Sequence, residues 1–417
     1  MTQHLYLFQE RKMKMKKRVL MAAMLATGLL TVSLPQTLYA AENVTINKLT
    51  NVPADFIKGA DISMLNEVEK HGGKFYDEHG KQKDAMLILK ENGINYIRLR
   101  IWNDPKDTAG NGYGGGNNDL ATTLALAKRA KANGMKVLLD FHYSDFWTDP
   151  AHQNKPKAWS DLNVAQLTTA VHDYTKATIS EFQKAGVMPD MVQIGNELNG
   201  GMLWPEGKSW GQGGGEFDRL AALLKAGIQG VKDVQGANNV KIMLHLAEGT
   251  KNDTFIWWFD EIVKRNVPFD VIGASFYTYW NGPISALQYN MNDVTKRYNK
   301  DIIVVEAAYA YTLENCDNAE NSFQQKELDA GGYPASVQGQ ANYLHDLMQS
   351  VINVPNQRGK GVFYWEPIWL PTPGATWATK AGMKYNKDEW KEGNARENQA
   401  LFDCKGNVLP SIKAFKS

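Results

Sequence analysis

The sequence alternates eight times between a short apolar run and a longer segment with helical patterning, and this repetition constrains the fold most strongly. The apolar runs lie at 56–62, 96–102, 136–142, 190–197, 240–245, 270–277, 302–306 and 361–366. The helical segments lie at 83–92, 119–133, 164–185, 216–235, 254–264, 284–298, 337–352 and, in helical and extended pieces, 397–413. Strands that alternate with helices in this way pair in parallel.

Eight such units fit a closed barrel better than an open doubly wound sheet. The apolar runs lack strict polar–apolar alternation, as expected of strands that are buried on both faces. Long segments follow several strands, at 102–118, 143–162, 198–215, 307–336 and 367–396. A barrel carries its active site on the face where these loops lie. The sequence therefore predicts an α/β fold, a single (β/α)8 TIM barrel at 41–417 with long loops on its C-terminal face.

Residues 1–40 precede the predicted barrel and have the composition of a secretory signal peptide. Basic residues are concentrated at 11–18, an apolar run follows at 19–34, and residues 38–40 resemble a cleavage site. The apolar run is short for a membrane-spanning helix, although an uncleaved anchor is the alternative. We expect a secreted protein, extracellular or periplasmic, with no membrane-spanning segment after cleavage.

The charge of the chain argues against two classes of partner. The formal net charge is +1, so there is no bulk electrostatic signature of binding to nucleic acid or to an anionic membrane. The 12 tryptophans stand out, because their flat rings suit both core packing and stacking on sugars. We expect no nucleic-acid partner and a monomeric protein, although the sequence carries no direct sign of the oligomeric state.

The two cysteines of the chain are Cys316 and Cys404. In an oxidising compartment such a pair favours a disulfide, and two unrelated free thiols are the alternative. Neither cysteine has histidine or cysteine neighbours at the spacing of a zinc site. The sequence therefore predicts no zinc centre.

The ends of the predicted strands carry chemically active side chains, which a barrel brings together at one mouth. The run at 190–197 ends in Asn196 and Glu197, and the run at 302–306 ends in Glu306. A carboxylate at the end of a buried strand is costly unless it is paired or used. The other strand ends supply Arg98, Arg100, Trp102, His142, Tyr143, His245, Tyr277, Tyr279, Trp365 and Glu366.

Two carboxylates with an arginine, aromatic rings and no metal-ligand spacing predict glycoside hydrolysis. That reaction needs a protonated carboxyl at the leaving oxygen and an ionised one at the anomeric carbon. Four β-branched residues precede Glu306, so burial should raise its pKa unless a cation opposes the effect. Either Arg98 or Arg100 is placed to do so, which makes Glu306 the nucleophile and Glu197 the acid/base. Asn196 is expected to hydrogen-bond the sugar hydroxyl beside the reacting carbon.

Several of these residues also have a purely structural interpretation. Arg98 and Arg100 share strand parity, so one of them could belong to a structural ion pair. His142 and His245 are either site contacts or buried histidines whose hydrogen bonds are satisfied. The same choice applies to Tyr277, because buried tyrosines usually find a partner.

Taken together, the mature chain resembles glycoside hydrolase family 53, the arabinogalactan endo-β-1,4-galactanases, whose barrels belong to clan A. The stretches that carry the resemblance include YIRLRIWNDP at 96–105, LLDFHYSDFWTDPAHQNKPKAW at 138–159, VQIGNELNGGMLWPEG at 192–207 and GVFYWEPIW at 361–369. Further matches lie at 59–81, 113–120, 304–312 and 398–403. The resemblance therefore covers the mature chain nearly from end to end.

The resemblance implies retaining endo-hydrolysis of β-1,4-galactosidic bonds in galactan and in the type I arabinogalactan side chains of pectin, releasing galacto-oligosaccharides. It assigns the acid/base role to Glu197 and the nucleophile role to Glu306. It also implies a set of substrate-binding residues and no required cofactor. These residues are Asn196, Arg98, Trp102, His142, Tyr277 and Trp365.

One loop departs from the family pattern. Bacterial relatives resemble one another in an acidic calcium loop after the seventh strand, but here residues 314–321 read ENCDNAEN. Asp317 and Glu320 are weak calcium candidates, because calcium needs several oxygen ligands. Cys316 lies in this loop and Cys404 in the last loop-facing segment. We therefore hypothesise that a Cys316–Cys404 disulfide ties the loops together as calcium does in those relatives.

Two other functions compete with this interpretation. One is another clan A endo-glycosidase, acting on mannan, cellulose or xylan. The other is a carbohydrate-binding barrel without activity, which the presence of both glutamates disfavours. Reducing-end release from galactan but not from the other glycans would separate the first alternative from the preferred one.

Overall fold

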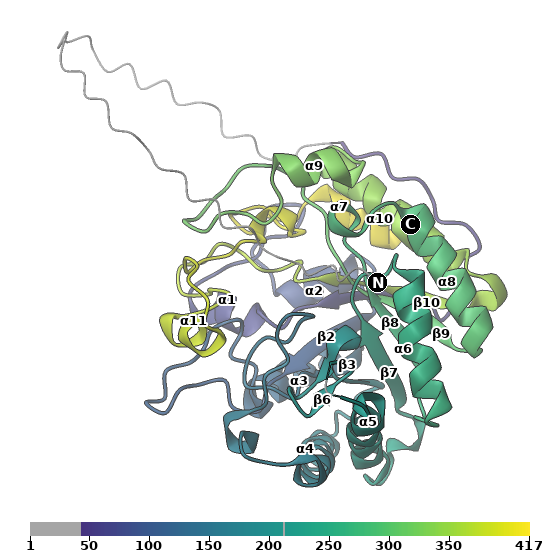
Figure 1. The fold of residues 1–417 in the computed structure, drawn as a ribbon. Coiled ribbons are helices and arrows are strands. Elements are labelled where there is room, and N and C mark those ends of the chain that lie inside the picture. The colour runs from purple at the N-terminus through teal and green to yellow at the C-terminus, as the bar shows by residue number, and fades with distance from the viewer. Residues whose placement is uncertain (1–42, 212) are drawn as a thin grey trace, which may run out of the picture. The chain divides into compact units, whose positions relative to one another are not determined.

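A computed structural model describes residues 43–211 and 213–417, and it contains the predicted barrel (Figure 1). Parallel strands close in the order β1-β10-β9-β8-β7-β4-β3-β2. Their bounds are β1 Ile57–Asp61, β2 Tyr96–Ile101, β3 Lys136–Phe141, β4 Met191–Ile194, β7 Lys241–Leu246, β8 Val271–Ser275, β9 Asp301–Ala307 and β10 Gly359–Trp365. The predicted fold class is confirmed. The predicted signal peptide, residues 1–40, lies outside the described residues.

Helices alternate with the strands and surround the barrel (Figure 1). They are α2 Ala85–Glu91, α3 Leu120–Ala132, α4 Val164–Lys184, α5 Glu216–Lys232, α6 Asn252–Lys264, α8 Ile284–Tyr298 and α10 Val337–Ile352. Local signals set several starts, because the side chain of Asp119 accepts the N–H of Thr122 and that of Ser336 accepts the N–H of Gly339. Within the described ranges, none of the helices has both the length and the apolar character needed to span a bilayer.

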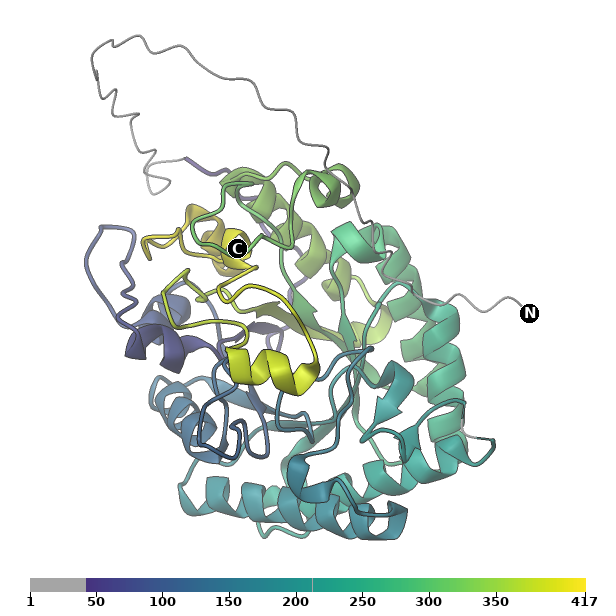
Figure 2. The same cartoon turned by 60° about the vertical axis from the view of Figure 1, so that its left-hand side comes forward.

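The segments that connect these strands and helices, and the end of the chain, contain further short elements. They are α1 Leu65–Lys70, β5 Gly201–Met202, β6 Gly207–Lys208, α7 Thr278–Asn281, α9 Gln325–Gly331 and α11 Lys380–Asn386, with 3-10 turns at Lys157–Trp159, Leu198–Gly200, Ala237–Asn239, Pro355–Gln357, Glu397–Gln399 and Pro410–Lys416. Strands β5 and β6 pair in an antiparallel hairpin. Figure 2 shows α11, in yellow-green, in front of the barrel strands. The elements that follow a barrel strand build up the loop face, whereas the turns at Ala237–Asn239 and Pro355–Gln357 directly precede β7 and β10.

The barrel interior changes from apolar to polar along the strands. Because strand side chains alternate between two faces, every second residue points inward. The apolar layer consists of Ile57, Tyr96, Leu138, Met191, Met243, Val271, Ile303, Val305 and Phe363. Two residues beyond four of these positions lie the buried polar side chains Arg98, Asp140, Gln193 and His245. The apolar layer therefore supports a polar layer at the C-terminal ends of the strands.

A disulfide joins the loop after β9 to the end of the chain. Cys316 and Cys404 are bonded to each other across 88 residues of sequence, as the hypothesis drawn from the family resemblance required. Hydrogen bonds support the same link, because the side chain of Asn398 donates to the carbonyls of Thr312 (3.0 Å) and Phe323 (2.9 Å). The two long loops after β9 and β10 are thus held together by covalent and polar contacts.

We predict that replacing both cysteines, Cys316→Ser with Cys404→Ser, lowers the free energy of unfolding. Opening a covalent loop of 88 residues frees the unfolded chain, and the expected loss is up to about 4–5 kcal/mol in the chain-entropy model. Urea denaturation measures the loss. A reductant should lower the stability of the wild type to a similar degree and leave the double variant unchanged. Equal urea midpoints for the wild type and the double variant would contradict the prediction.

Candidate active site

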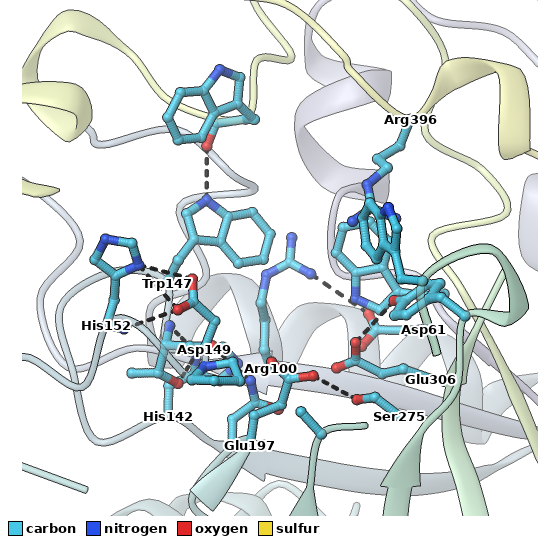
Figure 3. A pocket seen from close by; sticks show the side chains of 18 of the residues that line it. Asp61, Arg100, His142, Trp147, Asp149, His152, Glu197, Ser275, Glu306 and Arg396 are labelled. Carbon is cyan, nitrogen blue, oxygen red and sulfur yellow. Dashed lines mark hydrogen bonds and ion pairs between the residues drawn. The ribbon is translucent and has the colours of Figure 1, made fainter. Parts of the chain in front are cut away.

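A cavity of about 500 Å³ opens at the C-terminal ends of the barrel strands. Most of the predicted site residues line it, although they come from different strands (Figure 3). The predicted residues in its wall are Arg98, His142, Asn196, Glu197, Tyr277, Glu306 and Trp365. The barrel therefore brings both candidate catalytic glutamates to one cavity.

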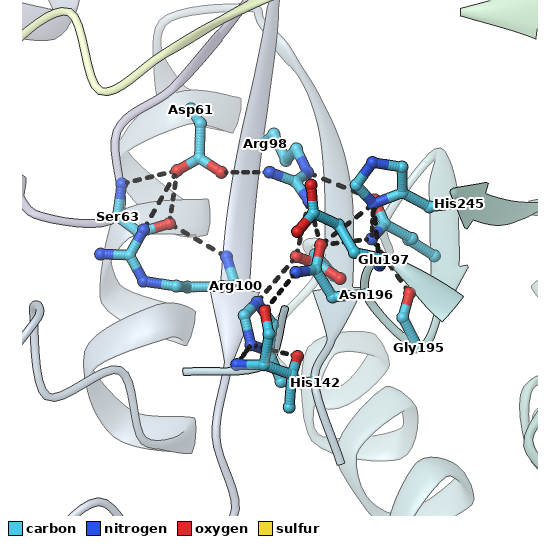
Figure 4. A network of polar contacts seen from close by, with 12 residues as sticks. Asp61, Ser63, Arg98, Arg100, His142, Gly195, Asn196, Glu197 and His245 are labelled. Carbon is cyan, nitrogen blue, oxygen red and sulfur yellow. Dashed lines mark hydrogen bonds and ion pairs between the residues drawn. The ribbon is translucent and has the colours of Figure 1, made fainter. Parts of the chain in front are cut away.

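Arg98 is the centre of the polar layer beneath this cavity (Figure 4). Its side chain is buried, and one terminal nitrogen donates to Asp61 at 2.9 Å and to Glu306 at 2.8 Å. The other terminal nitrogen donates to Asp140 at 2.8 Å and to Asn196 at 2.9 Å. Three carboxylates thus surround one guanidinium, whose planar fork can bind several acceptors at once.

Arg100 pairs with a different glutamate, Glu366, and it also lies 3.7 Å from Asp61, which it shares with Arg98. Its guanidinium donates to Glu366 Oε1 at 2.5 Å and to the carbonyl of Gly115 at 2.7 Å. The guanidinium also lies 4.3 Å from the ring centre of Trp147. Burial raises the pKa of Glu366 to about 8, and Arg100 opposes that rise. Of the two arginines considered, Arg98 is therefore the one beside Glu306, and Arg100 supports the cavity wall.

Glu306 occupies an irregular position near the end of β9. The pairing with β8 shifts register between Ala274 and Ser275, so that Ser275 faces Glu306. Such irregularities re-aim side chains at active sites. Besides its bond from Arg98, the carboxylate accepts a hydrogen bond from the Tyr277 hydroxyl at 3.0 Å. Burial raises the pKa of Glu306, while the adjacent Arg98 opposes the effect.

Glu197 has a different set of partners. Its backbone adopts φ 49° and ψ 58°, a left-handed conformation that is uncommon for residues other than glycine. The Ser275 hydroxyl donates to its Oε1 at 2.6 Å. Burial raises the pKa of Glu197 well above its usual range, and the charge of Glu306 raises it further. Arg98 donates directly to Glu306, whereas the hydroxyl of Ser275 donates to Glu197.

His245 completes a chain of hydrogen bonds that ends at Glu197. Its Nδ1 accepts from the Gln193 amide at 3.0 Å, and its Nε2 lies 2.8 Å from the Ser275 hydroxyl oxygen. Burial lowers the pKa of His245 well below its usual range, and Arg98 and His142 lower it further. The neutral ring therefore donates to Ser275, which donates to Glu197. Ser275 was not predicted as a site residue. It lies four residues after Val271 on β8, and Val271 belongs to the inward apolar layer, so strand parity turns Ser275 inward as well.

His142 and Asn196 are held by the loop that follows β3. The backbone N–H of Thr148 donates to Nδ1 of His142 at 3.1 Å, and Nε2 lies 3.1 Å from Asp140. The side-chain amide of Asn196 donates to the carbonyl of Thr148 at 2.7 Å. Both side chains are nearly buried and line the cavity. They consequently present fixed polar groups beside the two glutamates.

The prediction that Trp102 contacts substrate is wrong. Its side chain is 0% exposed, and its ring packs against Phe146 and Trp147, with 5.1 Å between ring centres in both pairs. The loop after β3 lays Trp147 over it, and Trp147 lines the cavity instead. Other aromatic side chains in the wall are Trp280, Trp365, Trp369 and Trp377. The guanidinium of Arg396 lies 4.8 Å from the ring centre of Trp280 and 5.1 Å from that of Trp365.

The two weak calcium candidates in the 314–321 loop, Asp317 and Glu320, do not form a set of ligands that suits calcium. The two carboxylate oxygens of Asp317 accept backbone N–H groups from Ala319 and Asn394, each at 2.7 Å. Glu320 is exposed. Within the described residues, the cluster of metal-type side chains found consists of Cys316, Cys404 and Glu397, and a disulfide bonds the two cysteines. Calcium requires several free oxygen ligands, which this loop does not present.

Comparisons with known proteins agree with this geometry. The family model described as glycosyl hydrolase family 53 matches residues 57–415. The chain is 38% identical to an endo-β-1,4-galactanase of Bacillus subtilis, covering 90% of this chain and 89% of the relative. It is 35% identical to an arabinogalactan endo-β-1,4-galactanase of Cellvibrio japonicus, covering 87% of this chain and 91% of the relative. The solved GH53 catalytic domain of Ignisphaera aggregans is 45% identical and superposes with a TM-score of 0.84, covering 90% of this chain and 99% of that domain.

We predict that Arg98→Met lowers the free energy of unfolding by about 3–5 kcal/mol, because it leaves three buried carboxylates without their cation. Arg129→Met is the matched control. Its guanidinium also pairs with two carboxylates, Glu69 and Asp84, but at a partly exposed position, so we expect a loss of at most about 1 kcal/mol. Urea denaturation of both variants measures the difference. Similar small losses for the two variants would contradict the central position given to Arg98.

Proposed function

This chain belongs to glycosyl hydrolase family 53, and we therefore propose that it hydrolyses β-1,4-galactosidic bonds within galactan and type I arabinogalactan, releasing galacto-oligosaccharides. Relatives named endo-β-1,4-galactanase and arabinogalactan endo-β-1,4-galactanase support the choice of substrate. The observation that carries the proposal is the contrast between two carboxyls in one cavity. Glu306 contacts an arginine and a tyrosine, whereas Glu197 accepts from a serine hydroxyl.

In the proposed first step, Glu306 attacks the anomeric carbon of the sugar bound beside it. A bond forms between its carboxylate oxygen and that carbon as the glycosidic bond breaks, and Glu197 gives its proton to the leaving oxygen. The hydrogen bond from Ser275 and the neutral His245 behind it orient the Glu197 carboxyl for this transfer. Charge leaves Glu306 and develops on Glu197, which becomes a carboxylate.

In the second step, the ionised Glu197 takes a proton from water, and the water oxygen attacks the anomeric carbon. As the bond to the water oxygen forms, the bond to Glu306 breaks with its electron pair on the carboxylate, which returns to Arg98. Two displacements at the same carbon retain the anomeric configuration. Arg98 and Tyr277 stabilise the carboxylate form of Glu306 through their hydrogen bonds, which favours its departure.

The cavity wall supports binding of a carbohydrate chain. Trp365 and Trp377, whose side chains are partly exposed, offer aromatic faces on which the apolar faces of sugar rings can stack. His142 and Asn196 add polar groups at the cleavage point, where sugar hydroxyls require hydrogen bonds. A binding site with aromatic walls and a few placed polar groups is typical of small-molecule and sugar sites.

We also propose that the protein is secreted, extracellular or periplasmic, and acts as a monomer without a required cofactor. The basic and apolar runs at 11–18 and 19–34 support export. The disulfide supports folding in an oxidising compartment, because such bonds are rare in reducing ones. Both catalytic carboxyls come from one chain, which supports a monomer as the working unit.

We predict reducing-end release from potato-type galactan, with no comparable release from mannan, cellulose or xylan. Glu306→Ala should lower the rate on galactan by about four decades or more, because it deletes the covalent catalyst. Glu91→Ala, which removes a carboxylate paired with Lys83 on the barrel surface, is the matched control and should keep the wild-type rate. Cleavage of galactan by Glu306→Ala at the wild-type rate would remove the nucleophile assignment. Stronger release from another glycan would remove the substrate assignment.

A further inference from the structure

The loop after β3 brings a carboxylate and an imidazole into the cavity that the proposed reaction does not use. Asp149 and His152 both line the cavity. Figure 3 shows them on the Glu197 side, whereas Arg396 lies on the side of Glu306. The charge of Asp149 also contributes to the raised pKa of Glu197, which places the two carboxyls within electrostatic reach of each other. The pair therefore stands where the leaving group meets its proton donor.

Hydrogen bonds on both sides of the Asp149–His152 pair fix this loop to the side chain and the backbone of Asn196. Asn196 donates from its side chain to the carbonyl of Thr148 at 2.7 Å. The side chain of Gln153, on the other side of the pair, donates to the carbonyl of Asn196 at 2.8 Å and to that of Asp149 at 3.2 Å. Because Asn196 precedes Glu197 directly, Asp149 and His152 keep a fixed place relative to the acid/base.

The two side chains are joined to each other and still open to solvent. Nδ1 of His152 lies 2.9 Å from Asp149 Oδ2, while Asp149 Oδ1 accepts the backbone N–H groups of Ala151 and His152. The hydrogen bond with Asp149 raises the pKa of His152, burial opposes the rise, and the charges of Asp149 and Asp388 add to it. Asp149 is 41% exposed and His152 32% exposed. Within residues 43–211 and 213–417, Nε2 of His152 has no hydrogen-bond partner.

From these contacts, and resting on the proposed galactanase function, we infer that Asp149 and His152 bind the galactose unit that leaves during cleavage. The glycosidic oxygen must contact Glu197 to receive its proton. The leaving sugar keeps that oxygen, so it lies on the Glu197 side of the cavity. Asp149 accepts a hydrogen bond from one hydroxyl of this sugar, and Nε2 of His152 contacts a second. A fixed acceptor beside an imidazole nitrogen suits two neighbouring hydroxyls of one sugar. The sugar that remains on the enzyme lies on the opposite side of the cavity, around Tyr277, Trp280 and Arg396.

Two substrates that differ only at the leaving group test this inference. Galactotetraose places a sugar on the Glu197 side, whereas 4-nitrophenyl β-1,4-galactobioside places an aromatic ring there that has no sugar hydroxyls. We expect Asp149→Asn and His152→Ala to lower kcat/KM on galactotetraose by about 10- to 100-fold, the scale of a lost hydrogen bond to a charged group. On the aryl substrate both variants should stay within about twofold of the wild type. When galactobiose is added to accept the glycosyl group from Glu306 in place of water, this transfer should also be slower in both variants.

A conservative substitution and a remote pair of the same residue types control for effects on folding. Asp149→Asn keeps an oxygen that can accept the N–H groups of Ala151 and His152, so the turn is preserved. His172 and Asp233 form a matched pair with 2.8 Å between Nε2 and Oδ2, on α4 and just after α5, and His172→Ala should leave both substrates unaffected. Equal losses on the two substrates, or no loss on either, would overturn the inference. A wild type that cleaves neither galactan nor the aryl galactobioside would instead overturn the proposed function.

Discussion

The buried guanidinium of Arg98 is the contact on which the rest of the site depends. Burying a charge costs several kcal/mol per ion, and this cost is offset only where geometry and hydrogen bonding are good. Arg98 meets that condition, because Asp61, Asp140 and Glu306 accept from it within 3 Å. Of the two candidate catalytic glutamates, Arg98 contacts Glu306, whereas Glu197 accepts a hydrogen bond from Ser275. This asymmetry is the basis for the proposal that Glu306 acts as the anion and Glu197 as the acid.

The barrel supplies that asymmetry through strand parity. Inward positions on β2, β3, β4 and β7 carry apolar side chains first and polar ones two residues later, so a packed layer excludes water beneath the charged layer. The loops then close the site from above. Trp147 covers Trp102 and stacks on Arg100, while the disulfide from Cys316 holds the loop after β9. The functional contacts are therefore a consequence of register in the strands and of packing in the loops.

The sequence predicted the parts of this arrangement that local patterns control. The bounds of α8 and α10 agree with prediction because each helix has a clear start, Pro283 before one and the cap Ser336 before the other. Glu197, Glu306 and Asn196 were found because they end apolar strands. Trp102 was wrongly predicted to bind substrate, because the packing of the loop after β3 decides whether its ring is buried. Asp61 and Ser275 were missed because their partners lie far away in sequence, although inward parity marks both. The Asp149–His152 pair was missed because it lies in a long loop, where no strand parity shows which side chains face the cavity.

The central claim is that Glu306 attacks the sugar while Glu197 holds the proton. A galactobioside with fluorine at carbon 2 of the reacting sugar and a good leaving group slows the second displacement more than the first, so the covalent intermediate accumulates. Proteolysis and mass spectrometry of the trapped protein then identify the labelled residue. The account predicts one galactobiosyl label per chain, on the peptide containing Glu306, and none in Glu306→Ala. A label on Glu197, or no covalent label while the substrate is consumed, would contradict it.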